Sequence, residues 1–124
     1  MATYPPPESY VTQECYQLRH KLLRDFTVED LRIMIGQGVG LPYLVPIAIR
    51  VLRDDPFAEG RHFIGDLLCQ VLRVDAGFYS ANLRLKKEVA EILDIAWSVL
   101  HVLSEDDAQF VKREMERALA RFGR

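Results

Sequence analysis

The chain has 124 residues, of which 49% are hydrophobic and 27% charged, and its formal net charge is −2. This length is typical of one domain that buries a core of its own. Nucleic-acid-binding proteins are usually basic, so the charge argues against nucleic acid as a partner. The longest apolar run, residues 44–49, is too short to cross a membrane, and the N-terminus lacks the regions of a signal peptide. We therefore expect a cytoplasmic protein without a membrane segment.

The first residues predict a lead followed by a helix. The proline run at residues 5–7 favours an extended backbone, so we expect residues 1–7 to form a flexible N-terminal lead and residues 8–124 one helical domain. Apolar residues then share one helical face over residues 8–23, which predicts the first helix. That face consists of Val11, Cys15, Leu18 and Leu22.

A second helix and a glycine-rich turn are predicted next. Thr27 and Asp30 have the spacing of a capping box, which predicts that a helix begins after Thr27. Gly36, Gly38 and Gly40 follow it and favour a left-handed C-terminal cap. A phosphate-binding loop is the weaker interpretation, because no strand precedes these glycines and no Gly-Lys-Ser/Thr sequence follows them.

The third predicted helix covers residues 42–54, with Pro42 at its first position. Apolar side chains surround nearly its whole circumference, so we expect it to be the buried centre of the domain. The two helices and their turn have the outline of a DNA-binding helix-turn-helix. Leu41, Tyr43 and their neighbours offer no row of polar groups to base edges, so we do not favour DNA binding.

The remaining chain predicts a loop and three further helices. The loop covers residues 56–63, a helix follows Gly65 with Asp66 as its N-cap, and a connector with one short turn covers residues 74–82. The longest helix is expected over residues 83–103, and Ser104 caps the last one. The predicted fold is all-α: a single compact bundle of about six helices around a buried central helix.

No combination of residues in the sequence predicts catalysis or a metal site. None of the histidines has another histidine or a cysteine three or four residues away, and no nucleophile-elbow motif is present. Cys15 and Cys69 lie within helical patterns and are expected to be reduced thiols. We therefore predict a protein that is not an enzyme and that needs no metal or cofactor.

The region between the third and fourth helices is acidic. Asp54, Asp55, Glu59 and Asp66 stand against one base, Arg61, which gives a local charge of −3 (four acids minus one base). One interpretation is a solvated loop that its two phenylalanines fix to the core. The other is a protein-binding patch with aromatic anchors and a negative field. Periodicity does not separate the two.

A resemblance to a known family spans residues 23–72. The shared pattern is L-R-I-M-I-G-Q-x-x-G-L-x-Y-L-x-P, followed by N/D-P-x-A-E-G-D-F-Y-x-G-D-L-L. The matching positions are residues 31–37, Gly40, Leu41, Tyr43, Leu44 and Pro46, then Pro56 and residues 58–60 and 65–68. In these positions the chain resembles the immunity proteins of bacterial contact-dependent growth inhibition (CDI) and related polymorphic-toxin systems. It departs from the pattern at residues 61–64, where Arg61 and His62 replace an acid and an aromatic residue.

The resemblance implies an immunity protein that binds a cognate toxin domain, a basic nuclease by expectation, and blocks its active site or substrate access. A monomer is the expected state. The predicted toxin-binding residues are Asp54, Asp55, Glu59 and Asp66, with Tyr43 and Tyr79 as aromatic anchors. The alternative function is that of a small helical adaptor or regulator that binds another protein.

Overall fold

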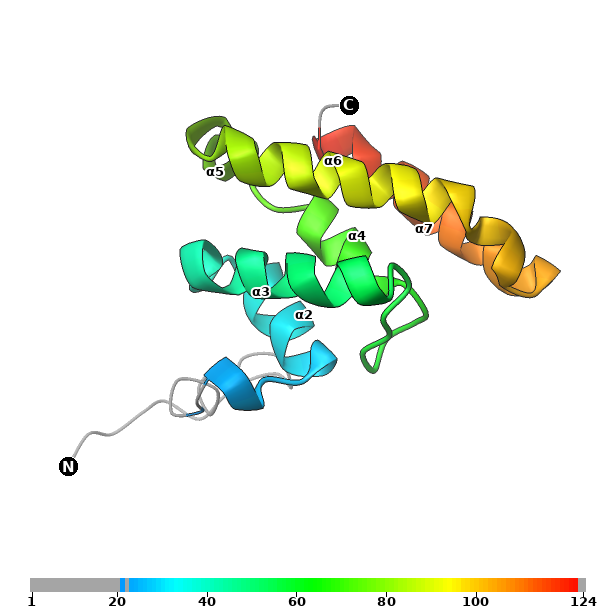
Figure 1. The fold of residues 1–124 in the computed structure, drawn as a ribbon, viewed down its shortest axis with the longest axis horizontal. Helices are drawn as coiled ribbons and strands as arrows, with labels where there is room; N and C mark the ends of the chain where they lie inside the picture. Colours follow the sequence, from blue (N-terminus) through cyan, green and yellow to red (C-terminus); the bar gives the residue numbers. More distant parts are fainter. Residues whose placement is uncertain (1–20, 22, 123–124) are drawn as a thin grey trace.

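The computed structural model describes residue 21 and residues 23–122, and Figure 1 shows the elements that they form. All elements in this part of the chain are helical, which confirms the all-α prediction. In chain order they are η1 (Leu23–Asp25), α2 (Val28–Gly36), α3 (Leu41–Asp54), α4 (Asp66–Leu72), α5 (Ala76–Ala81), α6 (Leu83–Ser98), η2 (Leu100–Val102) and α7 (Glu105–Phe122). None of the helices so described is long and apolar enough to cross a membrane.

Several predictions for the N-terminus concern residues outside the described part. These are the lead over residues 1–7, nearly all of the helix over residues 8–23, and the reduced thiol expected at Cys15. The domain bounds at residues 8 and 124 therefore stay predictions.

Helix α2 begins with the capping box that the sequence predicts. The Thr27 hydroxyl accepts a hydrogen bond from the Asp30 backbone N–H (3.1 Å), and the Asp30 carboxylate accepts one from the Thr27 N–H (2.9 Å). The Lys21 ammonium lies 2.6 Å from the same carboxylate. The start of α2 is thus fixed by local polar contacts.

The turn between α2 and α3, residues 37–40, is shaped by left-handed glycines. Gly38 (φ 71°) donates its N–H to the Ile35 carbonyl, and Val39 donates to Met34, which is the bond pattern of a Schellman cap. Gly40 (φ 66°) is the N-cap of α3. The turn prediction is confirmed, and we call residues 37–40 the glycine turn.

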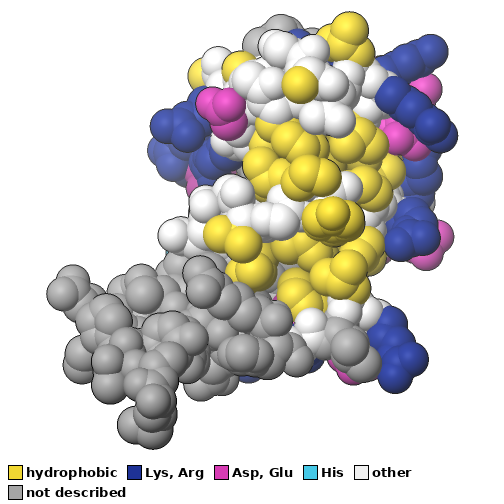
Figure 2. All heavy atoms as spheres, turned by 90° about the vertical axis from the view of Figure 1, so that its left-hand side faces the viewer, with side chains coloured by type: hydrophobic (Ala, Val, Ile, Leu, Met, Phe, Trp, Pro, Cys, Tyr) yellow, Lys and Arg dark blue, Asp and Glu magenta, His cyan; other side chains and the backbone are white. Residues whose placement is uncertain are grey.

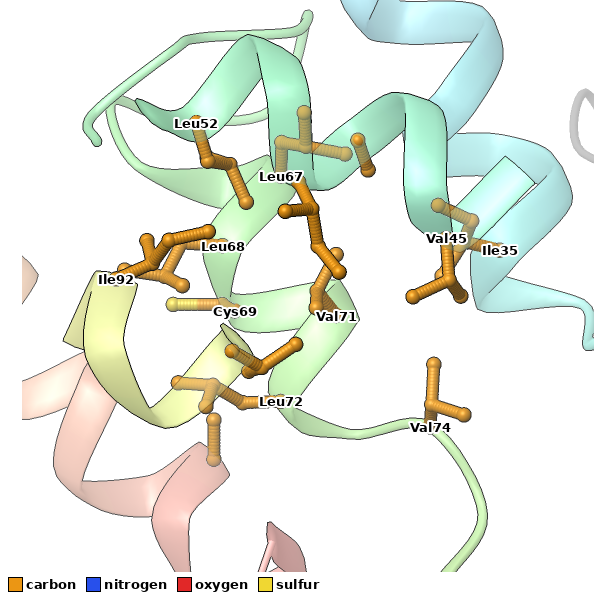
Figure 3. Packing of buried hydrophobic residues seen from close by; sticks show 14 of the residues in the cluster. Ile35, Val45, Leu52, Leu67, Leu68, Cys69, Val71, Leu72, Val74 and Ile92 are labelled. Atoms are coloured by element: carbon orange, nitrogen blue, oxygen red, sulfur yellow. The ribbon is translucent and has the colours of Figure 1, made fainter. Parts of the chain in front are cut away.

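A buried central helix is present, but it is α4 rather than α3. Six of the seven α4 residues are buried, and α4 contacts α2, α3 and α7. Figure 3 shows Leu68 beside Leu52 of α3 and Ile92 of α6. The placement of α3 at the centre was wrong because apolar content does not reveal how many neighbours cover a helix: one side of α3 stays exposed.

Two helix boundaries also differ from the sequence prediction. Helix α6 ends at Ser98 instead of residue 103, because the Ser98 hydroxyl donates to the Ile95 carbonyl and the chain tightens into η2. Gly65, with φ 82°, is the N-cap of α4, and Asp66 is its first helical residue. The N-cap assignment of Asp66 was therefore wrong. Its carboxylate instead accepts hydrogen bonds from the preceding loop. The short turn predicted within residues 74–82 is present as α5.

Candidate protein-binding surface

The loop between α3 and α4, residues 55–65, is held by a buried carboxylate at its end. Asp66 is 1% exposed, and its side chain accepts hydrogen bonds from three backbone N–H groups of the loop. The donors are Gly60 (2.7 Å, to Oδ1), His62 (3.0 Å, to Oδ2) and Phe63 (3.2 Å, to Oδ2). Such charge-assisted bonds are stronger than neutral ones, so they fix the backbone path. We call residues 55–65 the anchored loop.

Helix α2 supplies a second carboxylate to the same loop. Glu29 Oε1 accepts a hydrogen bond from the Arg61 N–H (2.8 Å), although the two residues are 32 positions apart. The Arg32 guanidinium donates to both Glu29 oxygens (2.8 and 2.7 Å) and lies 3.7 Å from Asp66 Oδ2. The positive charge of Arg32 therefore offsets the negative charges of Glu29 and Asp66, which the fold brings close together.

Close packing of the backbone against these carboxylates explains Gly60. A Cβ atom at this position would lie 2.7 Å from Glu29 Oε1 and 3.0 Å from Asp66 Oδ2. Any larger residue would have to push both carboxylates away from the amides that they bind. The glycine is thus required by the approach of the loop to its anchors.

The structure gives different places to the four acidic residues that the sequence singled out. Asp54, Asp55 and Glu59 are exposed, at the end of α3 and on the anchored loop, which lies at the right-hand end of α3 in Figure 1. Asp66 is buried and bound to loop amides, so its side chain has almost no surface to offer a partner. The exposed charge of this region is −2: three exposed acids minus Arg61.

Tyr43 and Asp54 lie on one solvent-facing stripe of α3. Arg50 lies between them on the same face, seven residues after Tyr43 and four before Asp54, and all three residues are exposed. Tyr43, 70% exposed, stands about 16 Å from Asp54 along the helix axis, at 1.5 Å per residue. The aromatic and acidic candidates are therefore at opposite ends of one continuous surface.

An open groove of about 600 Å³ runs beside the Tyr43 end of this stripe. Tyr43, Ile47 and Arg50 line it from α3, and Arg84 and Leu85 line it from α6. Figure 2 shows that hydrophobic side chains gather on this face, where α3 and α6 begin, with Lys and Arg along its edges. An exposed apolar face of this kind is typical of a surface that another protein contacts.

Tyr79 has a different environment from Tyr43. It is 1% exposed, its hydroxyl donates to the Val71 carbonyl (2.7 Å), and its ring meets Phe122 edge-on at 5.4 Å. Burial raises its pKa above the ordinary value. Tyr79 thus joins α5 to α4 and α7, and the fold leaves it no exposed ring for a partner.

Among the described residues, Cys69 is a buried thiol and the histidines do not take part in a metal-binding cluster. Burial in α4 raises the pKa of the Cys69 thiol from 9.0 to about 12, so the thiol stays protonated near neutral pH. Over the described residues, no group of three or more His, Cys, Asp and Glu side chains is placed to hold a metal ion. The described surface combines an anchored acidic loop, an exposed stripe and an apolar groove.

A family model matches residues 2–89, which is well over half of the chain. The matching model describes CDI immunity proteins. The chain belongs to this family. Comparisons with curated proteins and with solved structures gave no match.

The matched region of this CDI immunity protein contains all the surface described above. It includes the α3 stripe, the anchored loop and both carboxylate anchors, whereas α7 lies outside it. Sequence reasoning missed Glu29 and Arg32 as anchors. Glu29 is an acid in the first turn of α2, which the helix dipole explains equally well, and Arg32 matched the family pattern without an assigned role.

Proposed function

We propose that this chain neutralises a toxin domain by binding it and blocking its active site or substrate access. The observation that carries the proposal is the family match over residues 2–89. Its family implies a toxin partner, and binding alone is sufficient for inhibition, so no catalytic group or cofactor is required. We propose a complex of one immunity protein with one toxin domain.

The partner that best fits the acidic end of the surface is a basic domain, and a nuclease is the class we propose. Nucleases that bind the phosphate backbone carry positive charge at their active sites. Asp54, Asp55 and Glu59 would meet that charge, steer the encounter, and compete with nucleic acid for the same groups.

Tyr43 extends the proposed surface to the apolar groove. A standard interface buries about 800 Å² per partner, which is a patch roughly 30 Å across. The stripe from Tyr43 to Asp54 is shorter than this, so one toxin domain can reach both ends. Exposed aromatic residues are frequent hot spots, so the tyrosine would add contact area and the acids would add speed and selectivity.

The function is tested by co-expression. The toxin domain encoded immediately upstream of this gene is induced with and without the immunity chain. We expect growth to be restored and the two chains to elute together from a sizing column. Continued cell death together with separate elution of two folded chains would reject the proposal for that pair.

The acidic end is tested by charge reversal. Replacing Asp54, Asp55 and Glu59 with Lys changes the net charge from −2 to +4. The matched control replaces three exposed acids elsewhere, Asp25, Asp106 and Glu116, and gives the same net charge.

We expect the first triple variant to associate with the toxin at least 10-fold more slowly at low salt, with a smaller difference at high salt. The control should lose much less, because only the overall charge has changed. Equal association rates for both triple variants would show that the acidic end is not the toxin-facing surface.

A further inference from the structure

We propose that Asp66 and Glu29 are positioning residues for toxin binding: they hold the anchored loop in the one shape that a partner recognises. The inference rests on the proposed function, because it concerns how the same surface reaches its affinity. Neither side chain needs to touch the toxin. They act through the backbone of residues 60–63, and the exposed loop residues make the contact.

The pattern of hydrogen bonds carries this inference. Four consecutive backbone N–H groups, those of residues 60–63, all donate to carboxylates that lie outside the loop. Consecutive amides that point at fixed acceptors leave the segment little freedom. The helices α2 and α4 supply the acceptors, and these helices contact each other extensively in the core. Residues 60–63 are therefore tied to two helices of the core.

Some side chains of the loop face the solvent, whereas those of residues 57 and 58 are buried in the core. Glu59 and His62 are exposed, although the neighbouring backbone is bound to the anchors. The loop continues into Phe63, whose ring meets Phe110 of α7 edge-on at 5.4 Å. Phe110 is itself 42% exposed. The anchored backbone thus presents a charged residue, an imidazole and an aromatic edge in fixed relative positions.

The bound backbone and the exposed side chains have separate roles, which explains what the anchors contribute to binding. Ordering a flexible loop during association reduces affinity, and a loop that is already ordered avoids this cost. Because the anchors bind backbone amides, the path of the loop does not depend on the side chains at positions 59 and 62. Those positions can therefore fit a particular toxin while the loop keeps its shape.

The experiment compares Asp66→Asn with Asp30→Asn. Both replace a largely buried carboxylate with its isosteric amide at the start of a helix, but Asp30 binds Thr27 and Lys21 and has no bond to the loop. Amide hydrogen exchange is measured for residues 60–63 and for core amides of α4, and toxin affinity is measured in parallel.

For Asp66→Asn we expect exchange at residues 60–63 to accelerate at least 10-fold relative to the α4 core, and toxin affinity to fall about 10-fold, mainly through a faster dissociation rate. Asp30→Asn should change neither the exchange of residues 60–63 relative to the α4 core nor the toxin affinity, even if it lowers the stability of the fold. Unchanged loop exchange in Asp66→Asn would overturn the positioning role.

A second variant separates geometry from charge. Gly60→Ala leaves both carboxylates in place, but its methyl group displaces them from the amides, since Glu29 Oε1 would be only 2.7 Å away. We expect the same loss of loop protection and of toxin affinity. A loosened loop with unchanged affinity in both variants would also overturn the inference. It would leave the immunity function intact, because co-expression tests that function with the unmodified chain.

Discussion

Two connections in this fold, the glycine turn and the anchored loop, are fixed in opposite ways. In the glycine turn, residues 37–40, every fixing bond joins groups a few positions apart, and the left-handed conformations of Gly38 and Gly40 set the path. In the anchored loop, residues 55–65, the decisive acceptors are Asp66 and Glu29, and Glu29 comes from a helix that lies far away in sequence. The first connection is local and the second depends on the folded core.

This difference indicates which of the two connections is better suited to bind a partner protein. The glycine turn leaves only Gln37 and Val39 to vary, because its shape requires glycine at the other two of its four positions. The anchored loop requires Gly60, but its bonds to the two carboxylate anchors come from backbone N–H groups, and the side chains of Glu59 and His62 are exposed. A fixed backbone with variable side chains is what an inhibitor of a particular toxin needs.

The largest effect is expected from removing the main anchor. Asp66→Ala leaves three loop N–H groups without their acceptor and removes the carboxylate that lies 3.7 Å from the Arg32 guanidinium. We expect the free energy of unfolding to fall by about 4 kcal/mol. Urea denaturation measures it. A loss below about 1 kcal/mol would mean that the network contributes little to the fold.

The glycine turn should be the next most sensitive element. Gly40→Val forces a β-branched residue to φ 66°, and its Cβ would lie 3.4 Å from the Leu44 side chain. We expect a loss of about 2 kcal/mol, while Gly40→Asn should lose less than half of that because asparagine tolerates this conformation. Equal losses in the two variants would show that backbone strain is not the cause.

The pH dependence of stability tests the burial of α4. The folded thiol of Cys69 keeps its proton up to about pH 12, whereas the unfolded thiol loses it near 9.0. Its contribution is therefore complete below pH 9 and is lost as the pH rises from 9 toward 12. The expected slope is about −1.4 kcal/mol per pH unit from this group. Cys69→Ala should show a shallower decline between pH 9 and 10.5. Identical slopes in both proteins would contradict the burial of this thiol.

The smallest effects are expected at the outward positions of the anchored loop. Glu59→Ala and His62→Ala should each change the free energy of unfolding by less than about 0.5 kcal/mol, because both side chains are exposed. Thermal unfolding is sufficient to measure this. A loss of 2 kcal/mol at either position would mean that the loop does depend on its own side chains.

Local signals in the sequence predicted the local structure well. The Thr27–Asp30 capping box and the glycines after α2 depend on neighbours a few residues away, so their spacing is visible in the chain. The choice of α3 as the central helix failed, because burial depends on how helices from distant parts of the chain assemble. The end of α6 was missed because the apolar spacing continues beyond Ser98.

The candidate surface could be predicted only in part. Asp54, Asp55, Glu59 and Tyr43 were singled out by charge, aromatic character and family resemblance, and the structure exposes all four. The same criteria selected Asp66 and Tyr79, which the fold buries. No feature of an isolated Asp-Leu-Leu sequence shows that its carboxylate will meet the amides of a preceding loop. The contact between this carboxylate and the loop amides forms only when α2 and α4 have packed together.

We propose above all that the toxin contacts the anchored loop and the adjoining stripe of α3. Photo-crosslinking tests it most directly, with a benzophenone amino acid placed at position 59, at position 43 or, as a control, at position 116 on α7. We expect covalent toxin adducts from position 59, and from position 43 if the interface reaches the groove, but none from position 116. Adducts from position 116 together with none from position 59 would contradict the account.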